Sequence, residues 1–309
     1  MSSTCPFFGK CGGCRFDVMA DDYRKQKLAT LPKFLDSCNP IWIAWGQRRR
    51  ADAAFAGGEF GFFQNGTKNI VPVRFCPNLS QKINTILPML ADLPWGGTGA
   101  CLITECENGI DVAITSSVPY FTQEFKNAAN NIPAIRITWN NKVVTQSQQP
   151  IVKFGDHAVQ YPSNAFLQPT IVGADELRQL VVSRAVGAKR VADLFCGLGN
   201  FTFALNADGF DIVGTGVKRD LFKKPLTVGM LNNYDCVVMD PPRAGADAQC
   251  KEIINSNVKR IIYVSCNPNT FVRDKSTLEH GGYKMVEIIP VDQFVGSNHW
   301  ELFSVFEKQ

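Results

Sequence analysis

Residues 189–200 read Lys-Arg-Val-Ala-Asp-Leu-Phe-Cys-Gly-Leu-Gly-Asn, a short apolar run that ends in an acid and a glycine loop. Such a run is typical of a buried strand in a parallel sheet that turns into a helix. Glycines at that turn let the backbone approach a ligand, and the start of the helix offers free N–H groups. A bare Gly-x-Gly says little by itself. A dinucleotide-binding fold would more often have a third glycine, where this chain has Thr202.

Two later apolar runs also end in residues that can do chemistry. Tyr-Asp-Cys-Val-Val-Met (234–239) leads into Asp240-Pro241-Pro242-Arg243, and Arg-Ile-Ile-Tyr-Val-Ser (260–265) leads into Cys266-Asn267-Pro268. In open α/β sheets, ligands bind outside the carboxyl ends of the strands. A thiol near the start of a helix can have its pKa lowered by the helix dipole. A lone cysteine would be interpreted as buried and structural. Three strand ends with a glycine loop, an acid and a thiol instead predict an active site.

The composition sets broad limits. A chain of 309 residues can hold two domains and a small module, and 45% hydrophobic with 19% charged residues is ordinary for a folded protein. No stretch approaches the ~20 apolar residues of a membrane span, and the N-terminus does not resemble a signal peptide. We therefore expect a cytoplasmic monomer with no membrane partner. The net charge of +4 permits a nucleic-acid partner but does not demand one.

The cysteine content is high for such a chain, at eleven residues, and disulfides are unexpected in the cytoplasm. Cys5, Cys11 and Cys14 lie within ten residues, with two glycines between the last two. Cys76 is the candidate fourth ligand, and Cys38 competes with it. Four thiolates suit zinc or an iron–sulfur cluster. Because zinc sites more often use two Cys-x2-Cys pairs and only one is present, the pattern favours a [4Fe–4S] cluster.

The pattern along the chain predicts three parts: a cluster segment (1–39), a β-rich central domain that binds RNA (40–162) and an α/β domain (163–309). Hairpins are predicted at 60–73 and at 135–145, the second with an Asn-Asn turn. Helices are predicted at 23–31, 79–93, 122–131, 174–188, 248–255 and 269–278, with a short one at 225–231. Strands at 290–294 and 302–306 would close a doubly wound sheet.

The chain resembles the RNA 5-methyluridine methyltransferases. The resemblance is carried by the four cysteines named above, Phe166-Leu167-Gln168, residues 193–201, residues 240–243, Val264-Ser265-Cys266-Asn267-Pro268 and His299-Trp300-Glu301. These pieces run in the family's order over nearly the whole chain. The cysteines resemble the branch that acts on 23S rRNA, since the tRNA branch usually lacks them. The N-terminal RNA-binding barrel of some relatives is absent.

The resemblance implies a class I methyltransferase sheet that uses S-adenosylmethionine to methylate a uracil at C5. By resemblance, Cys266 would be the nucleophile and Glu301 the general base. Gln168, Phe195, Asn200, Asp220 and Asp240 would line the cofactor. Glu301 can act only if the last strands fold back beside Cys266; otherwise it is a surface glutamate. Arg48-Arg49-Arg50, with Lys223-Lys224 behind it, is the candidate phosphate contact.

The chain departs from the family between the glycine loop and Asp240. Only 47 positions separate Asp193 from Asp240, although one strand–helix–strand unit needs roughly 30 residues or more. The sheet is therefore expected to be shortened by about one βα unit, with a strand only at 210–213. Asp208 and Asp211 are the nearby candidates for a ribose-binding acid, and neither is at a clear strand end. The alternatives are a non-catalytic RNA-binding relative that has lost cofactor binding, and a tRNA methyltransferase.

Overall fold

The chain forms two compact units in the computed structural model, which describes residues 5–35 and 37–309. The first unit takes in the chain up to Lys27, Ala44–Ile171 and Val295–Asn298, and the second takes in Leu28–Ile43, Val172–Phe294 and His299–Gln309. Within the described ranges, no helix is both long and apolar enough to cross a membrane.

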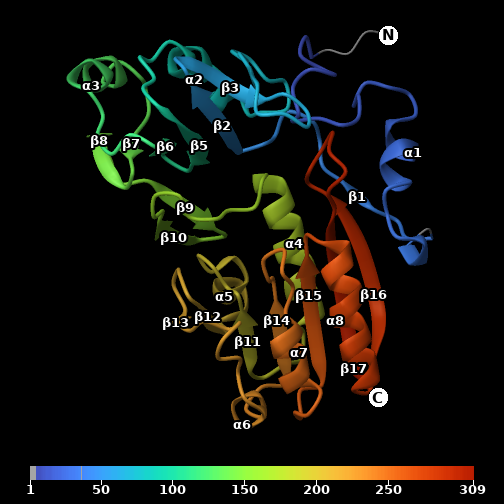
Figure 1. Ribbon diagram of the computed structural model, residues 1–309. Coiled ribbons are helices and arrows are strands. Elements are labelled where there is room, and N and C mark those ends of the chain that lie inside the picture. The colour runs from blue at the N-terminus through green and yellow to red at the C-terminus, as the bar shows by residue number, and fades with distance from the viewer. Residues whose placement is uncertain (1–4, 36) are drawn as a thin grey trace. The chain divides into compact units, whose positions relative to one another are not determined.

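The second unit is built on an eight-stranded sheet in the order β1-β16-β17-β15-β14-β11-β12-β13 (Figure 1). Its strands are β1 (Ile41–Trp42), β11 (Val191–Leu194), β12 (Asp208–Asp211), β13 (Val217–Lys218), β14 (Cys236–Met239), β15 (Arg260–Ser265), β16 (Tyr283–Asp292) and β17 (Glu301–Lys308). Strands β11 to β15 are parallel, and β17 runs antiparallel to both β15 and β16. The predicted doubly wound α/β sheet is confirmed.

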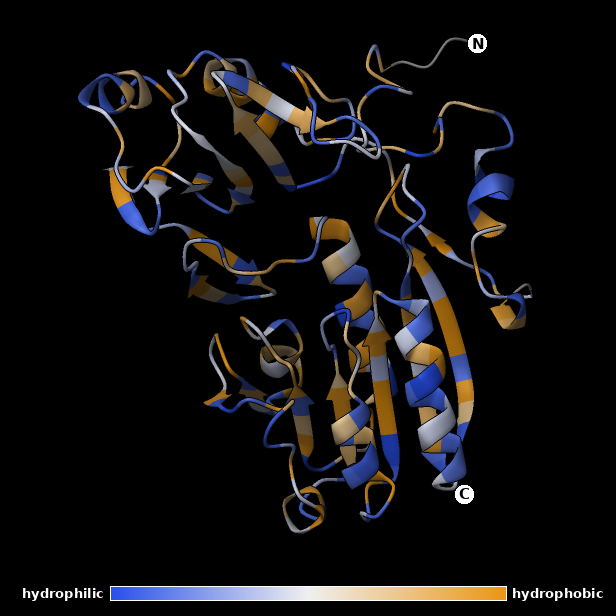
Figure 2. Ribbon diagram, in the orientation of Figure 1, coloured by the Kyte–Doolittle hydropathy of each residue, from blue (hydrophilic) through white to orange (hydrophobic). Residues whose placement is uncertain are grey.

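The helices of this sheet are α4 (Ile171–Arg184), α5 (Asn200–Leu205), α6 (Val228–Leu231), α7 (Asp247–Ile253) and α8 (Pro268–His280). All four residues of β14 and five of the six in β15 are buried, and Figure 2 shows both strands as largely hydrophobic. That is the pattern of strands covered on both faces. Phe271 and Leu278 of α8 are fully buried in the same core as Ile261 and Tyr263 of β15.

The interval between the glycine loop and Asp240 differs from its prediction. The predicted strand at 210–213 is β12, which begins earlier and ends at Asp211, and a second strand, β13, pairs with it through only two residues. Residues 212–216 join them, although a parallel pair ordinarily needs a crossover of a dozen or more residues. The sheet therefore keeps both strand positions, and the missing piece is the helix between them.

The first unit contains a seven-stranded sheet in the order β4-β3-β2-β5-β6-β7-β8 and a two-stranded sheet of β9 and β10. The strands are β2 (Arg50–Ala56), β3 (Glu59–Phe63), β4 (Ile70–Val71), β5 (Thr98–Cys106), β6 (Gly109–Ser116), β7 (Arg136–Trp139), β8 (Lys142–Gln146), β9 (Ile151–Phe154) and β10 (His157–Gln160). Helices α2 (Gln81–Ala91) and α3 (Gln123–Ala129) accompany them, and α1 (Tyr23–Leu28) precedes them, whereas the 3-10 turn at Lys33–Leu35 belongs to the second unit.

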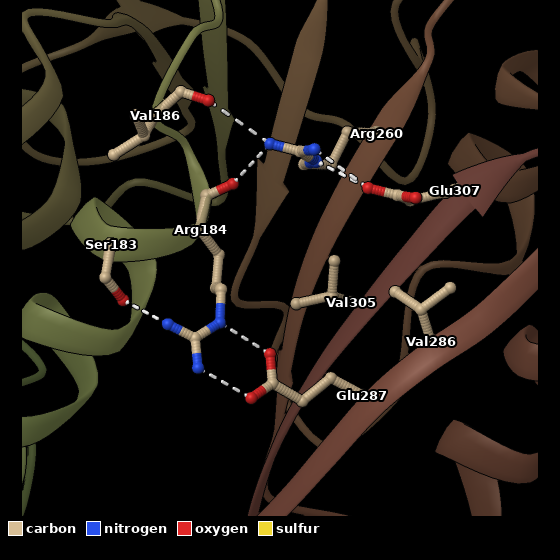
Figure 3. Close-up of a pocket in the computed structure, with 8 residues that line it drawn as sticks. All are labelled: Ser183, Arg184, Val186, Arg260, Val286, Glu287, Val305 and Glu307. Carbon is tan, nitrogen blue, oxygen red and sulfur yellow. Dashed lines mark hydrogen bonds and ion pairs between the residues drawn. The ribbon is translucent and has the colours of Figure 1, made fainter.

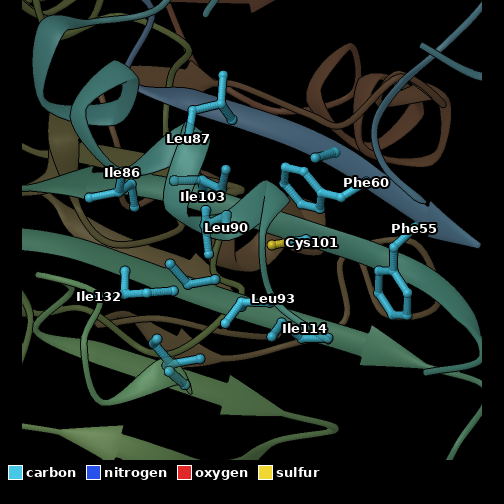
Figure 4. Close-up of a cluster of buried hydrophobic side chains, with 14 of the residues drawn as sticks. Phe55, Phe60, Ile86, Leu87, Leu90, Leu93, Cys101, Ile103, Ile114 and Ile132 are labelled. Carbon is cyan, nitrogen blue, oxygen red and sulfur yellow. The ribbon is translucent and has the colours of Figure 1, made fainter. Parts of the chain in front are cut away.

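Both predicted hairpins are confirmed. Asn140 and Asn141 join β7 to β8 with φ values of 47° and 63°, the left-handed pair that a two-residue hairpin turn requires. One face of the large sheet packs on α2 around Leu87, Leu90 and Ile103, each fully buried (Figure 4). The unit therefore has a core of its own, as the β-rich composition predicts.

Candidate active site

Three parallel strands bring the predicted chemistry to one edge of the second unit. The register pairs Leu194 of β11 with Met239 of β14, and Met239 with Tyr263 of β15. The chain leaves these strands at Phe195, Asp240 and Cys266, respectively. The carboxyl ends of neighbouring parallel strands lie at the same edge, which is where such sheets bind ligands.

The closing strand brings Glu301 to Cys266. In the antiparallel pairing of β15 and β17, Ser265 lies opposite Leu302, so that the next residues, Cys266 and Glu301, extend the same register. The Glu301 side chain is not on the surface, because only 2% of the residue is exposed. The last strands therefore fold back beside Cys266, which was the condition for Glu301 to act there.

Burial and two acids raise the pKa of the Cys266 thiol to about 12. Burial is the largest cause, followed by the negative charges of Glu301 and Asp240, while the Arg243 guanidinium lowers the pKa. Cys266 does lie next to the start of α8, whose cap is Asn267. The position at a helix start therefore does not by itself set the pKa of this thiol, which is raised overall.

The Glu301 carboxyl also has a raised pKa, first because it is buried and then because Asp240 is close. One contact acts in the opposite direction. The Gln293 amide Nε2 donates a hydrogen bond of 2.7 Å to Glu301 Oε2 and lowers the pKa. Oε1 of Glu301 has no hydrogen-bond partner in the part of the chain that the structure describes. Gln293 was not predicted, because nothing in Asp292-Gln293-Phe294 marks it as part of a site.

The turn after β14 is hydrogen-bonded to the start of α8. The Arg243 carbonyl accepts hydrogen bonds from Asn267 Nδ2 at 2.8 Å and Thr270 Oγ1 at 3.2 Å. The Arg243 guanidinium reaches the His299 ring, with Nη2 3.0 Å from Nδ1. Arg243 and His299 were recognised only as parts of motifs; the structure adds Arg243 to the site, because its guanidinium lowers the pKa of Cys266, and His299 as its contact.

The glycine loop carries acceptors that the protein itself leaves unused. Asp193 Oδ2 accepts a hydrogen bond of 2.6 Å from Thr202 Oγ1, but Oδ1 has no partner among the described residues, and neither does Asn200 Oδ1. Burial raises the pKa of Asp193 to about 7. Two buried, unsatisfied acceptors suit a ligand with a cationic donor. The ammonium group of S-adenosylmethionine fits that requirement.

Asp211 is the last residue of β12 and so does lie at a strand end, which corrects the prediction from sequence. Its carboxylate is used within the protein: Oδ2 accepts from the Gly197 amide at 2.9 Å and Oδ1 from the Val213 amide at 3.1 Å. The connection also packs tightly on the glycine loop. A Cβ on Gly214 would lie 1.8 Å from the Gly197 carbonyl oxygen, so only glycine fits there.

The remaining predicted cofactor residues divide between the units. In the second unit the Phe195 and Phe222 rings are 5.4 Å apart, and Asp220 Oδ1 accepts a hydrogen bond from the Phe222 amide. Asp220 and Phe195 therefore share one neighbourhood. Gln168 lies in the first unit, where it is 8% exposed, and is not among the residues that the second unit brings together.

The arginine triplet is structural. Arg49 is 5% exposed and donates to the Glu105 carbonyl, and Arg50 donates to the Leu167 carbonyl at 2.9 Å. Arg48 is half-buried, with its guanidinium near Cys14. The prediction that this triplet is the phosphate contact is therefore wrong for Arg49 and unsupported for its neighbours.

The four N-terminal cysteines lie near one another in the first unit. Burial, followed by the charges of Cys76, Cys11 and Cys5, raises the pKa of Cys14 to about 12. Cys38, the competing fourth ligand, belongs to the second unit and has no such neighbours. Across residues 5–35 and 37–309, no group of three or more His, Cys, Asp or Glu side chains has the geometry of a metal site. The predicted cluster is therefore not shown.

A separate pocket lies near the amino end of β15. Figure 3 shows Arg184 facing Glu287, with hydrogen bonds of 2.6 and 2.7 Å, and Arg260 facing Glu307 at 2.8 Å. Arg260 begins β15 and Cys266 follows its last residue, so this pocket is remote from the thiol. Its charged groups pair with each other and hold α4 against β16.

Two comparisons identify the family. The family model described as tRNA (Uracil-5-)-methyltransferase matches residues 218–309. A protein of Agrobacterium fabrum, described as an uncharacterized RNA methyltransferase, is 33% identical over 354 positions that cover 97% of this chain and 83% of that protein. The chain belongs to the RNA 5-methyluridine methyltransferase family. Because the aligned region is longer than the 309 residues of the chain, that family member carries residues that this one lacks.

Other family members support the same placement. The 23S rRNA (uracil(1939)-C(5))-methyltransferase RlmD of Salmonella typhi is 26% identical over 98% of this chain and 81% of its own length. The crystal structure of Pyrococcus abyssi tRNA (uracil-54, C5)-methyltransferase with S-adenosyl-L-homocysteine matches with a TM-score of 0.73 at 20% identity, over 97% of this chain and 86% of that one. At that identity the match shows the fold, and it confirms the class I methyltransferase sheet.

Proposed function

We propose that this chain transfers a methyl group from S-adenosylmethionine to C5 of a uridine in 23S rRNA through a covalent bond between Cys266 and C6. The proposal is carried by one observation: β15 and β17 bring a thiol and a buried carboxyl together at the edge where such sheets bind ligands. We further propose a monomer, which light scattering of the purified protein would test.

The chemistry calls for these two groups. Uracil C5 is a poor nucleophile, and addition of the Cys266 thiolate to C6 makes an enolate whose C5 can take up an electrophilic carbon. S-adenosylmethionine supplies that carbon, as a sulfonium methyl group, when it is bound. Glu301 then removes the proton from C5, and Cys266 is expelled as the C5–C6 double bond forms again.

The raised pKa of Cys266 means that the thiol is largely protonated in the free protein. With a pKa of about 12, only about one molecule in 10⁴ carries the thiolate at pH 8. Arg243 stabilises the thiolate, and a protonated Glu301 removes a negative charge from beside it.

The glycine-loop residues would hold the cofactor. Asp193 and Asn200 offer the two unused acceptors, and Phe195 offers a ring beside the Asp220 turn. Asp240 follows β14 at the same edge. By resemblance, Gln168 would also bind the cofactor. Calorimetry with S-adenosylmethionine tests this directly: binding at micromolar affinity supports it.

The second candidate is a non-catalytic RNA-binding protein, and the short connection between β12 and β13 favours it. Asp211, the acid in the ribose-binding position, already accepts two backbone hydrogen bonds. If calorimetry detects no S-adenosylmethionine binding while RNA binding persists, this candidate replaces the enzyme.

We propose that Cys5, Cys11, Cys14 and Cys76 hold a [4Fe–4S] cluster that orders the N-terminal segment for RNA contact. Burial and the neighbouring thiols raise the pKa of Cys11, Cys14 and Cys76, and such a group suits a metal centre, because the cluster's positive charge favours the thiolates. Iron and acid-labile sulfide should be found after anaerobic purification. Cys11→Ser should lose them and lower solubility or RNA affinity, whereas Cys38→Ser, the matched control, should keep them. Zinc in place of iron would contradict the proposal.

The RNA is proposed to be rRNA, because the four cysteines resemble that branch; a tRNA target is the alternative. The target base must leave its stack to reach Cys266, and exposed aromatic rings can hold unpaired bases. Phe8, Phe63 and Phe75 are 37%, 49% and 53% exposed, and each lies next to a residue packed on the first unit's core. Methylation of unmodified 23S rRNA in competition with unmodified tRNA separates the two targets.

A further inference from the structure

The closing strands build a buried pair of side chains, Gln293 and Glu301. Gln293 is 1% exposed and Glu301 is 2% exposed, and the amide Nε2 donates to the carboxyl Oε2 at 2.7 Å. Their positions follow from the sheet, since β16 pairs Val291 with Glu301 and Gln293 follows two residues later. The contact therefore belongs to the fold of the site and is not a chance meeting of surface side chains.

This hydrogen bond lowers the pKa of Glu301, whereas the other influences on that carboxyl raise it. Burial and the nearby Asp240 both favour the protonated carboxyl, which cannot accept a proton, while the hydrogen bond from Gln293 favours the carboxylate. The bond also engages only one oxygen. Oε1 has no partner among residues 5–35 and 37–309, so it is the oxygen that is left to accept a proton.

We propose that Gln293 is the positioning residue of the elimination step: it fixes Oε2 of Glu301 and leaves Oε1 to take the proton from C5. The inference rests on the proposed function. In the step, the C5–H bond breaks and its proton goes to Oε1. The electron pair forms the C5–C6 double bond, and the C6–S bond breaks to release Cys266 as a thiolate. The amide can donate to Oε2 throughout, because the proton arrives on the other oxygen.

A positioning role and a merely structural role have different signatures. If Gln293 serves elimination, its loss slows only the last step, after Cys266 has already joined the RNA and the methyl group has been transferred. The covalent complex then accumulates. If Gln293 only stabilises the fold, its loss lowers the amount of active protein and changes neither the ratio of complex to product nor the pH profile.

The test compares Gln293→Met, which has nearly the same shape but no donor, with Gln249→Met. Gln249 of α7 is also a buried glutamine, 1% exposed, and both of its hydrogen bonds are to the Leu226 backbone. Wild type and both variants are mixed with unmodified RNA and methyl-labelled S-adenosylmethionine, quenched in detergent and separated by electrophoresis. We expect methyl-labelled protein–RNA complex to rise about tenfold or more in Gln293→Met, and not in Gln249→Met.

Two further measurements make the test decisive. The acid limb of kcat should move to higher pH in Gln293→Met, and Gln293→Asn, which keeps an amide donor, should recover part of the turnover. Wild type with RNA that contains 5-fluorouridine is the reference, because that base has no C5 proton to lose. Suppose that the 5-fluorouridine reference gives covalent complex, but Gln293→Met gives no more complex than wild type and its pH profile is unchanged. That result overturns the positioning role of Gln293 and leaves the proposed function standing. No complex in either overturns both.

Discussion

Asp193→Asn should make the stability of this protein less dependent on pH. Asp193 is fully buried, and its pKa rises from 3.8 to about 7 on folding. Below pH 3.8 both states hold the proton and burial of the carboxyl has no effect. As the pH rises, the unfolded chain releases the proton first, so the folded state loses stability until the pH passes 7. The full loss is about 4 kcal/mol, since each unit of pKa corresponds to about 1.36 kcal/mol.

About 2.5 kcal/mol of that loss falls between pH 5 and pH 8. Asparagine cannot ionise, and its amide oxygen can still accept the Thr202 hydrogen bond. Urea unfolding at the two pH values should show Asp193→Asn gaining about 2.5 kcal/mol more, relative to wild type, at pH 8 than at pH 5. Asp156→Asn, on the exposed surface, is the matched control. An equal effect of Asp193→Asn at both pH values would show that folding does not raise the pKa of this carboxyl, and would refute the argument.

Three further substitutions test other parts of the account. Gly214→Ala should cost at least about 2 kcal/mol in urea unfolding, because φ is +93° and the added Cβ meets the glycine loop, whereas Gly229→Ala, with open space around it, should change little. Arg136→Met should lower the free energy of unfolding by roughly 3–5 kcal/mol, because it leaves the buried Asp111 carboxylate, now 2.6 Å from Arg136, without its ion-pair partner. A loss under about 1 kcal/mol would contradict this. Arg243→Met should slow alkylation of Cys266 by iodoacetamide at pH 9, measured by mass spectrometry of the Cys266 peptide, because the guanidinium lowers the thiol's pKa. An unchanged rate would show that Arg243 does not lower the pKa of Cys266.

Much of the second unit could be predicted from sequence, because its parallel strands are short apolar runs that end in recognisable residues. The runs before Phe195, Asp240 and Cys266 are β11, β14 and β15, and their ends do meet at one edge. β13 could not be predicted. It is two residues long and exposed, so it has neither the length nor the apolar pattern of a strand.

The chemistry of the site was less predictable than its location. The pKa of Cys266 depends on which charges surround it in space, and local sequence shows only the helix that follows it. Gln293 lies eight residues from Glu301, and only the pairing of β16 with β17 brings the two together. The prediction for Arg49 was wrong for a related reason: a run of charges in sequence gives no sign that one of them will be buried and hydrogen-bonded to a backbone carbonyl.

The most direct test of the account is methyl transfer by the purified protein. The protein is incubated with unmodified 23S rRNA and methyl-labelled S-adenosylmethionine, beside a Cys266→Ala control, and the RNA is digested to nucleosides. The account predicts label in 5-methyluridine that is absent from the control. Label in another nucleoside, or label that persists in Cys266→Ala, would contradict it.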